Sequence, residues 1–369
     1  MQTVHTMDVS ETTRAAAPAS TPEAQQPERA AHARPSAAKR IAAGLAFDRI
    51  GAIYVWAGIA VVFAIWVPDQ FLTSATAKQI LNANALIALA ALSITIPLAA
   101  RVFDLSFAFT MSLAGVTAAH FVAVGLPLSL ALLLALGVGL GIGLINAIVV
   151  VVMKIDSFIA TLATGSLIQS LITMATGDTV ILHINLAGDF SKIGQTDVSG
   201  LTLPVFYAVG VAFAIWYLLE HTATGRRLYA TGFNPDAARL AGVRTERLRF
   251  VSLVASGGLA GFAGIVLAST IQSGSPTAGT PYLLPAFAAA FLGATQLKHG
   301  RFNAWGTIIA VLLLGTGTTG LALAAAPQWA ADMFVGVVLI ASLAVTGIQK
   351  RATAGRGRLA WARLRRSTA

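Results

Sequence analysis

The sequence predicts an all-α polytopic membrane protein with about ten transmembrane helices and both termini in the cytoplasm. Its 369 residues are 56% hydrophobic and only 11% charged, and the mean hydropathy is +0.75. Soluble globular chains usually carry about 25% charged residues, so this composition excludes a soluble enzyme. Two further observations support the prediction: a series of long charge-free windows and an uneven distribution of lysine and arginine.

Residues 1–45 are predicted to form a disordered cytoplasmic tail. They are rich in Ala, Pro, Thr, Gln and Glu and show no periodic apolar pattern, so they cannot bury enough surface to offset the entropy of ordering. No apolar core of about 7 to 15 residues follows a short basic start, which argues against a cleavable signal. We expect the transmembrane domain at residues 46–348 and a basic cytoplasmic tail at residues 349–369.

Charge-free windows locate the spans, because one charged side chain at a helix centre costs about 2.5 to 3.5 kcal/mol. Leu105–Met153 and Phe250–Leu297 are each too long for one helix of about 20 residues, and they contain breakers at Gly125-Leu126-Pro127 and Gly274-Ser275-Pro276. Each of these windows therefore predicts two helices. The remaining windows predict one helix each: Ile50–Pro68, Gln79–Ala100, Ser157–Gly177, Val198–Leu219, Phe302–Ala331 and Met333–Gln349.

Lysine and arginine set the orientation of these spans. With ten helices, all but two of the 25 lysines and arginines lie in the tails or in connections on the same side as the tails, the exceptions being Lys78 and Lys192. This asymmetry places both tails in the cytoplasm. Basic residues beside anionic lipid also account for the net charge of +10, so we expect no nucleic-acid partner.

Two blocks of equal length, Gln79–Thr176 and Phe250–Gly347, are separated by one predicted helix and therefore enter the membrane from opposite sides. Equal length with inverted orientation fits an inverted repeat. The two blocks share no convincing residue-level similarity, so the repeat is a hypothesis from length and topology alone.

The chain lacks the residues that energy coupling would need. None of its six lysines follows a glycine, so it has no P-loop and does not hydrolyse ATP alone. Within the spans the ionisable candidates are His120 and Asp332, which is little for a proton- or sodium-coupled carrier. With no cysteine and no protease motif, we expect no catalytic residue, no metal site and no cofactor.

The connection at residues 220–249 is the one substantial cytoplasmic loop. Asn234 is a suitable N-cap, Pro235 suits the first helical position, Asp236 complements the positive helix end, and Gly242 can take the left-handed conformation after the last turn. This predicts a short helix at Pro235–Ala241. Its mostly small side chains around Leu240, with Arg239 available for a polar contact, could fit a groove on another protein, although an ordinary capped surface helix remains the alternative.

The stretch ATGFNPDAARLAGV, Ala230–Val243, resembles the cytoplasmic motif of the ribose-type permease family of bacterial ABC importers. Further matches follow in the family's order over most of Ile50–Gly347. They are FDLS at Phe103–Ser106, Gly143 with Asn146, FIATL at Phe158–Leu162, SGGLAGFAG at Ser256–Gly264, AAFLGA at Ala289–Ala294 and GRFNAWGT at Gly300–Thr307. Each match is weak alone, but their order and spacing together are specific.

The resemblance implies a permease subunit in the bacterial inner membrane that passes a monosaccharide or related polyol by alternating access. It implies three protein partners: an ABC ATP-binding subunit, a periplasmic sugar-binding protein and a second copy of the permease. The short helix would then be the coupling helix that transmits ATP-driven closure to the spans. The coupling residues implied are Gly232, Asn234, Pro235, Ala237, Ala238, Arg239, Leu240 and Gly242.

One departure concerns the residues before the family's Asp-Leu-Ser. Relatives in this family usually have small, glycine-rich residues there, whereas this chain has Arg101-Val102-Phe103. We therefore expect an ion pair between Arg101 and Asp104 at the membrane interface.

A polar stripe marks the fifth predicted helix, where Thr161, Gly165, Gln169 and Thr173 recur every four residues and share one face. We hypothesise that this stripe, with Asn146, lines the translocation path, because polar faces in spans avoid lipid. Hydrogen bonding between helices is the alternative. For Asn146, as for Asn82 and Asn84, a hydrogen bond to neighbouring backbone is the simpler expectation.

Small residues repeat in the fourth and seventh predicted helices, at Gly137, Gly139, Gly141 and Gly143 and at Ser256, Gly257, Ala260, Gly261 and Gly264. Such repeats let helix backbones approach closely. Static packing and a gating hinge both remain possible from the sequence.

Three other functions remain open at this point. A branched-chain amino-acid ABC permease has a related cytoplasmic motif. An ion-gradient-driven secondary carrier would work without an ATPase, and a membrane scaffold would carry no solute.

Overall fold

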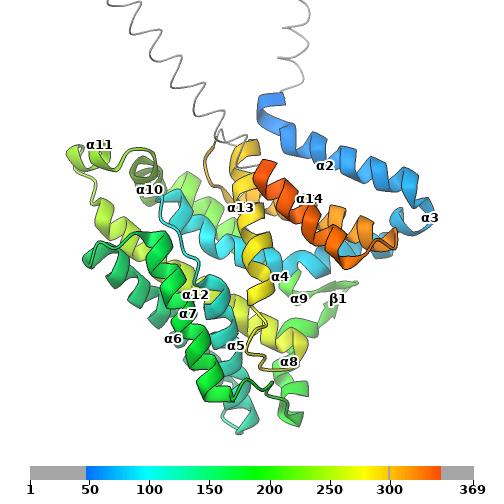
Figure 1. Cartoon of the computed structure of the whole chain (residues 1–369), viewed down its shortest axis with the longest axis horizontal. Helices are drawn as coiled ribbons and strands as arrows, with labels where there is room; N and C mark the ends of the chain where they lie inside the picture. The colour runs from blue at the N-terminus through cyan, green and yellow to red at the C-terminus, as the bar shows by residue number, and fades with distance from the viewer. Residues whose placement is uncertain (1–46, 298–299, 342–369) are drawn as a thin grey trace, which may run out of the picture. The chain divides into compact units, whose positions relative to one another are not determined.

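The computed structural model describes residues 47–297 and 300–341, nearly all of them helical (Figure 1). All of these lie in the second of two compact units, residues 46–369. The predictions for the tails at residues 1–45 and 349–369, and for the end of the last window, lie outside the described residues.

The apolar helices follow the order of the predicted windows. They are α2 (Phe47–Trp66), α4 (Ser74–Ala99), α5 (Phe107–Ala123), α6 (Leu128–Ala147, continued by a π-helical turn at Ile148–Val152), α7 (Ser157–Thr176), α9 (Leu203–Trp216, continued by a π-helical turn at Tyr217–His221), α12 (Thr245–Ile271), α13 (Leu283–Leu297), α14 (Ala304–Leu323) and a helix at Gln328–Ala341.

Shorter elements connect them. They are α3 (Pro68–Phe71), a 3₁₀ turn (Ile184–Ala187), α8 (Asp189–Gln195), the two-stranded hairpin β1 (Asp197–Val198) and β2 (Leu201–Thr202), α10 (Ala223–Phe233), α11 (Pro235–Leu240) and a second 3₁₀ turn (Thr280–Tyr282).

Six of the described helices are long and apolar enough to cross a membrane, and four shorter apolar helices accompany them. This confirms an all-α polytopic architecture, while the count of ten spans stays a prediction. Both long windows divide into two helices, as predicted. The first division follows from Gly125, whose φ of +86° lies in the left-handed region that glycine adopts without strain.

The segment Asp178–Ser199 between α7 and α9 contains the first 3₁₀ turn, α8 and the first strand. Leu186 and Phe190 are fully buried in a cluster with residues of α5, α6 and α12. Gln195 of α8 also donates a hydrogen bond to the carbonyl of Thr270 at 2.8 Å. Apolar anchors spaced four residues apart therefore fold this segment onto the helix ends.

Helix α12 is the centre of the packing, in contact with α4, α5, α6 and α8. It crosses α6 with the two backbones touching: a Cβ at Gly139 would lie 2.6 Å from the carbonyl oxygen of Gly257, and a Cβ at Gly143 would lie 2.7 Å from that of Leu253. The predicted close approach of these two glycine-rich helices is confirmed. Gly137 and Gly141 face open space instead, so only one face of the repeat makes the contact.

Candidate functional site

The predicted short helix is α11, which ends one residue earlier than expected. The side-chain oxygen of Asn234 accepts a hydrogen bond from the backbone N–H of Ala237 at 3.1 Å, which is the predicted N-cap. Gly242 follows with φ at +81°, and its N–H donates to the carbonyl of Arg239 at 2.9 Å. The short helix, its N-cap and the left-handed glycine after it are therefore confirmed, while its end is one residue earlier than predicted.

The side chains of this region divide into an inner and an outer set. Ala238 is buried against the protein at 5% exposure, whereas Phe233 and Leu240 are 90% and 91% exposed. These are the highest fractions among the exposed large hydrophobic residues of the described chain, and they lie outside the candidate spans. Both side chains are therefore apolar and almost fully exposed in the single chain, and the sequence places them outside the apolar windows. We call Phe233, Arg239 and Leu240 the α11 surface.

Helix α10, which precedes α11, packs against α4 and α12. A Cβ at Gly232 would overlap the carbonyl oxygen of Ala99, so α10 lies directly against the end of α4. Leu228 is buried in one apolar cluster with Val102 and Leu253, which belong to the α4–α5 connection and to α12. The glycine of the motif is therefore required for close contact.

Tyr229 adds a polar anchor on the same helix. Its hydroxyl donates to the carbonyl of Phe302 at 2.8 Å, and the Arg301 guanidinium lies 5.5 Å from the centre of its ring. Burial, with a smaller contribution from the charge of Glu220, raises the pKa of Tyr229 to about 12. The hydroxyl thus stays a hydrogen-bond donor at physiological pH.

The predicted path residues on α7 have different environments in this chain. Thr161 is fully buried, and its hydroxyl accepts from the backbone N–H of Leu105 at 2.9 Å and donates to the carbonyl of Ser157 at 2.7 Å. Gly165 lies against the ring of Phe109, 2.6 Å from where a Cβ would be. Thr161 therefore binds the connection between α4 and α5, and Gly165 packs against α5.

Further along α7, the side chains of the polar stripe become more exposed. The Gln169 side-chain oxygen is buried without a hydrogen-bond partner among the described residues, and Thr173 is exposed. The structure therefore does not gather the four residues around one cavity of this chain, and their role in a path stays a prediction.

A buried polar network surrounds Asp104, which is 1% exposed. One of its carboxylate oxygens accepts from the N–H and hydroxyl of Ser106 at 3.0 and 2.7 Å, and the other accepts from the hydroxyl of Ser256 at 2.7 Å. Asn146 donates to the Ser106 hydroxyl at 2.7 Å, while its own oxygen is buried without a partner in the described chain. Burial raises the pKa of the Asp104 carboxyl, and these hydrogen bonds oppose the rise.

The expected Arg101–Asp104 ion pair is wrong. Among the described residues the one ion pair is Lys192 with Asp189, and Arg101 is exposed with φ at +59°. Serine hydroxyls satisfy Asp104 instead, and one of them is 152 residues away in sequence.

Ser157 and Ser256 were missed as site residues by the sequence reasoning. The sequence signals only that a carboxylate between two apolar windows needs hydrogen-bond donors, and it does not say which distant residues supply them.

The other intramembrane asparagines bind backbone, as expected. Asn84 donates to the carbonyl of Ile80 at 2.8 Å, and Asn82 accepts from the N–H of Thr202 at 2.9 Å and donates to the carbonyl of Gly200 at 3.0 Å. Asn146 differs, since its amide binds a side chain.

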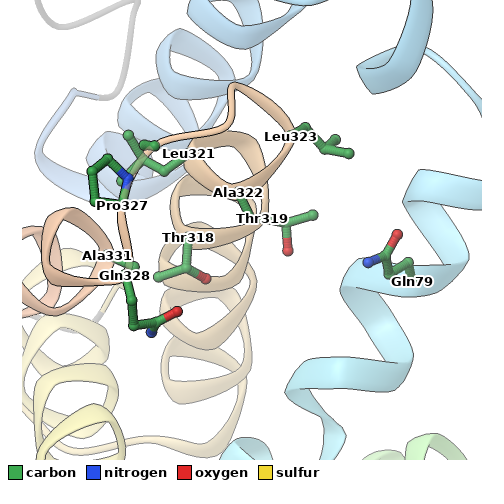
Figure 2. Close-up of a pocket in the computed structure, with 10 residues that line it drawn as sticks. Gln79, Thr318, Thr319, Leu321, Ala322, Leu323, Pro327, Gln328 and Ala331 are labelled. Carbon is green, nitrogen blue, oxygen red and sulfur yellow. The ribbon is translucent and has the colours of Figure 1, made fainter.

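Two depressions open at the end of α4 that lies opposite α10. One, of about 400 Å³, lies between α4, α14 and the helix at Gln328–Ala341; Figure 2 shows Thr319, Leu323 and Gln79 facing one another across it. The other, of about 670 Å³, is lined by Lys78, Gln79, Asn82 and residues of α8, the hairpin and α12. Gln79 lines both, and either is large enough for a small polar solute.

Comparison with known proteins identifies relatives over most of the chain. Residues 76–343 match the family described as "Branched-chain amino acid transport system / permease component". The L-arabinose transport system permease protein of Escherichia coli is 33% identical over 301 residues, 81% of this chain and 90% of that protein. The ribose import permease protein of Bacillus subtilis is 32% identical over 282 residues, 76% of this chain and 88% of that protein.

A third relative, the D-allose transport system permease protein of Escherichia coli, is 27% identical over 302 residues, 82% of this chain and 92% of that protein. No solved structure matches the chain.

Proposed function

Because the chain belongs to the family of branched-chain amino acid transport system permease components, we propose that it is the membrane-spanning permease subunit of an ABC importer for a monosaccharide or related polyol. The importer would work in the bacterial inner membrane by alternating access. The chain supplies the route for the solute, and a partner ATPase supplies the energy, since the sequence contains no P-loop.

The names of the relatives favour a sugar over a branched-chain amino acid. The family description carries the amino-acid name, whereas the ribose, L-arabinose and D-allose permeases align over three quarters or more of this chain. The depressions beside Gln79 are lined by amide, hydroxyl and ammonium groups together with apolar side chains. Such groups can exchange hydrogen bonds with sugar hydroxyls.

The observation that carries the ATPase coupling is the α11 surface. It exposes Phe233 and Leu240 outside the candidate spans, while α10 beneath it is packed tightly onto α4 and α12. Exposed arginines lie on the neighbouring segments of the chain, among them Arg226 on α10, Arg244 after α11, and Arg101 after α4. A partner groove with an apolar floor and an acidic rim would fit this surface, and we assign that groove to the ABC ATP-binding subunit.

The proposal includes the inverted repeat and ten spans. Helix lengths support the repeat, because α4 and α12 are the longest at 26 and 27 residues, and short α5 and α13 follow them at 17 and 15. Both long helices end in a left-handed residue, Arg101 or Gln272. The long helix of each block also packs against the helices of the other block. Helix α12 packs against α5 and α6, and α4 packs against α13 and α14.

The remaining partners follow from the same proposal. A periplasmic sugar-binding protein would deliver the solute at the end of the helices opposite α11. A second copy of the chain would complete the path, which accounts for the exposed outer part of the α7 stripe at Thr173.

Uptake measurements test the function. In a strain lacking this gene, we expect loss of uptake of one labelled monosaccharide from a panel of ribose, L-arabinose and D-allose, with unchanged uptake of leucine, isoleucine and valine. Loss of amino-acid uptake in place of sugar uptake would favour a branched-chain amino-acid importer.

Energy coupling is tested with vesicles that contain the chain with or without its ATP-binding subunit. We expect uphill sugar uptake only with the subunit and ATP, and no effect of collapsing the proton or sodium gradient. Uptake by the chain alone that follows an ion gradient would establish a secondary carrier. If no solute crosses the membrane under any condition, the chain would be a membrane scaffold without transport activity.

A further inference from the structure

The connection between α4 and α5 is tied to three other helices through side chains. We call residues Val102–Ser106 the bridge. The Ser157 hydroxyl accepts from the N–H of Phe103 at 3.1 Å, and Thr161 accepts from the N–H of Leu105 at 2.9 Å, so α7 holds the bridge at two points. Ser256 connects it to α12, and Asn146 connects it to α6.

Asp104 joins the links to α12 and α6. Its carboxylate accepts from two groups of Ser106 and from Ser256, in a site closed to solvent. The Ser106 hydroxyl in turn accepts from Asn146, so a continuous chain of hydrogen bonds runs from α6 through the bridge to α12. Removal of the carboxylate would leave buried donors unpaired and break this chain.

The start of the bridge lies against the helix that carries the α11 surface. Gly232 of α10 contacts the carbonyl of Ala99 with no room for a side chain, two residues before Arg101. Leu228 of α10 and Val102 of the bridge belong to the same buried cluster. A displacement of α10 would therefore move the end of α4, from which the bridge continues, because this contact is between backbones rather than flexible side chains.

We propose that Asp104 is a positioning residue that couples α10 and α11 to α6 and α12. The proposal rests on the proposed function, in which an ATPase moves the α11 surface. The movement reaches the bridge through the end of α4, where Gly232 lies against Ala99. It passes to α12 and α6 through the hydrogen bonds of Ser256 and Asn146, while Ser157 and Thr161 hold the bridge to α7. Ser256 lies about three turns from the start of α12.

The test uses the assembled importer in vesicles, with sugar uptake and ATP hydrolysis measured on the same preparation. We expect Asp104→Ala to lower uptake by at least about tenfold, a loss within the range for unpaired buried donors, while hydrolysis stays within about twofold of wild type. Ser256→Ala should lower uptake less, and the double variant should be no worse than Asp104→Ala.

Two further variants separate coupling from folding. In Asp104→Asn, the amide can accept from Ser106 and donate to the Ser256 hydroxyl, so it should recover most of the uptake. Ser252→Ala is the matched control, because the Ser252 hydroxyl lies one turn earlier on α12 and binds only the carbonyl of Arg249 at 2.8 Å. We expect wild-type uptake from this control.

Three outcomes would overturn the proposal: wild-type uptake in Asp104→Ala, parallel loss of uptake and hydrolysis in every variant of the network, or additive losses in the double variant. If Asp104→Ala does not fold, Asp104→Asn and Ser256→Ala still decide. A wild-type importer with no ATP-dependent uptake would instead refute the proposed function, which separates the two failures.

Discussion

Two residues near α11 have a left-handed backbone conformation, and one is a glycine whereas the other is an arginine. Gly242 has φ at +81° and Arg101 has φ at +59°. A left-handed residue with a side chain costs about 1 to 2 kcal/mol. The Arg101 conformation closes the last turn of α4, where the N–H of Val102 donates to the carbonyl of Pro97 at 2.9 Å. An arginine thus takes, at this turn, a conformation that glycine would take without strain.

Substitution at Gly242 tests the end of α11. No atom lies within 4 Å of where a Cβ would be, so any effect comes from backbone conformation alone. We expect Gly242→Val to weaken binding of the ATP-binding subunit by about tenfold, because a β-branched residue resists this conformation. Copurification of the subunit would measure it. Gly242→Asn is the matched control, since asparagine tolerates the left-handed region, and equal weakening by both variants would contradict the assignment.

Asp104 shows how a residue prediction from neighbouring sequence fails. An arginine three positions away suggests a pair, but pairing would require the arginine to turn into the protein, whereas it is exposed beside α10. The nearest donors in space come from Ser106 and from Ser256, and the second is invisible without the packing of α12 against the bridge.

Among the elements, α6 and α12 illustrate what a small-residue repeat can and cannot predict. The spacing predicts close approach, and the structure confirms it. The repeat contains glycines on two faces of α6, however, and only Gly139 and Gly143 meet α12. Which face is used depends on where the partner helix lies.

The two faces of α6 give a stability test with an internal control. Gly143→Ala places a Cβ 2.7 Å from the carbonyl oxygen of Leu253, so the helices must separate, and we expect destabilisation by about 1 to 3 kcal/mol. Gly141→Ala, two residues away, faces open space and should leave stability unchanged or slightly higher. Thermal unfolding in detergent would measure both. Equal destabilisation by Gly143→Ala and Gly141→Ala would contradict the observed contact between α6 and α12.

At the scale of the whole molecule, the α7 stripe passes from the interior to the surface. Thr161 is committed to the bridge, and Thr173 is exposed. In a permease homodimer, the outer part of the stripe can face the path between the two copies, while the inner part positions the bridge. The stripe would thus serve both functions that the sequence left open, at different depths.

Thiol labelling of the assembled importer tests this division. The chain contains no cysteine, so single substitutions give a clean background. We expect Thr173→Cys to react with an aqueous thiol reagent faster than Met174→Cys, which is its neighbour at the same depth and 77% exposed in the single chain. Thr161→Cys should stay unreactive. Equal rates for residues 173 and 174 would reject a water-filled path along this face.

The sequence by itself determined the architecture, the helix breaks, the short helix with its caps and the family. These properties depend on local composition, on the cost of charge in lipid and on the conformational preferences of asparagine, proline and glycine, all of which act over a few residues. Only the tertiary structure decided that Asp104 pairs with Ser256, that one face of α6 meets α12, and that Gly232 rests on the end of α4. Each of these contacts joins residues more than a hundred positions apart, and no local preference specifies which distant partner fills a given position.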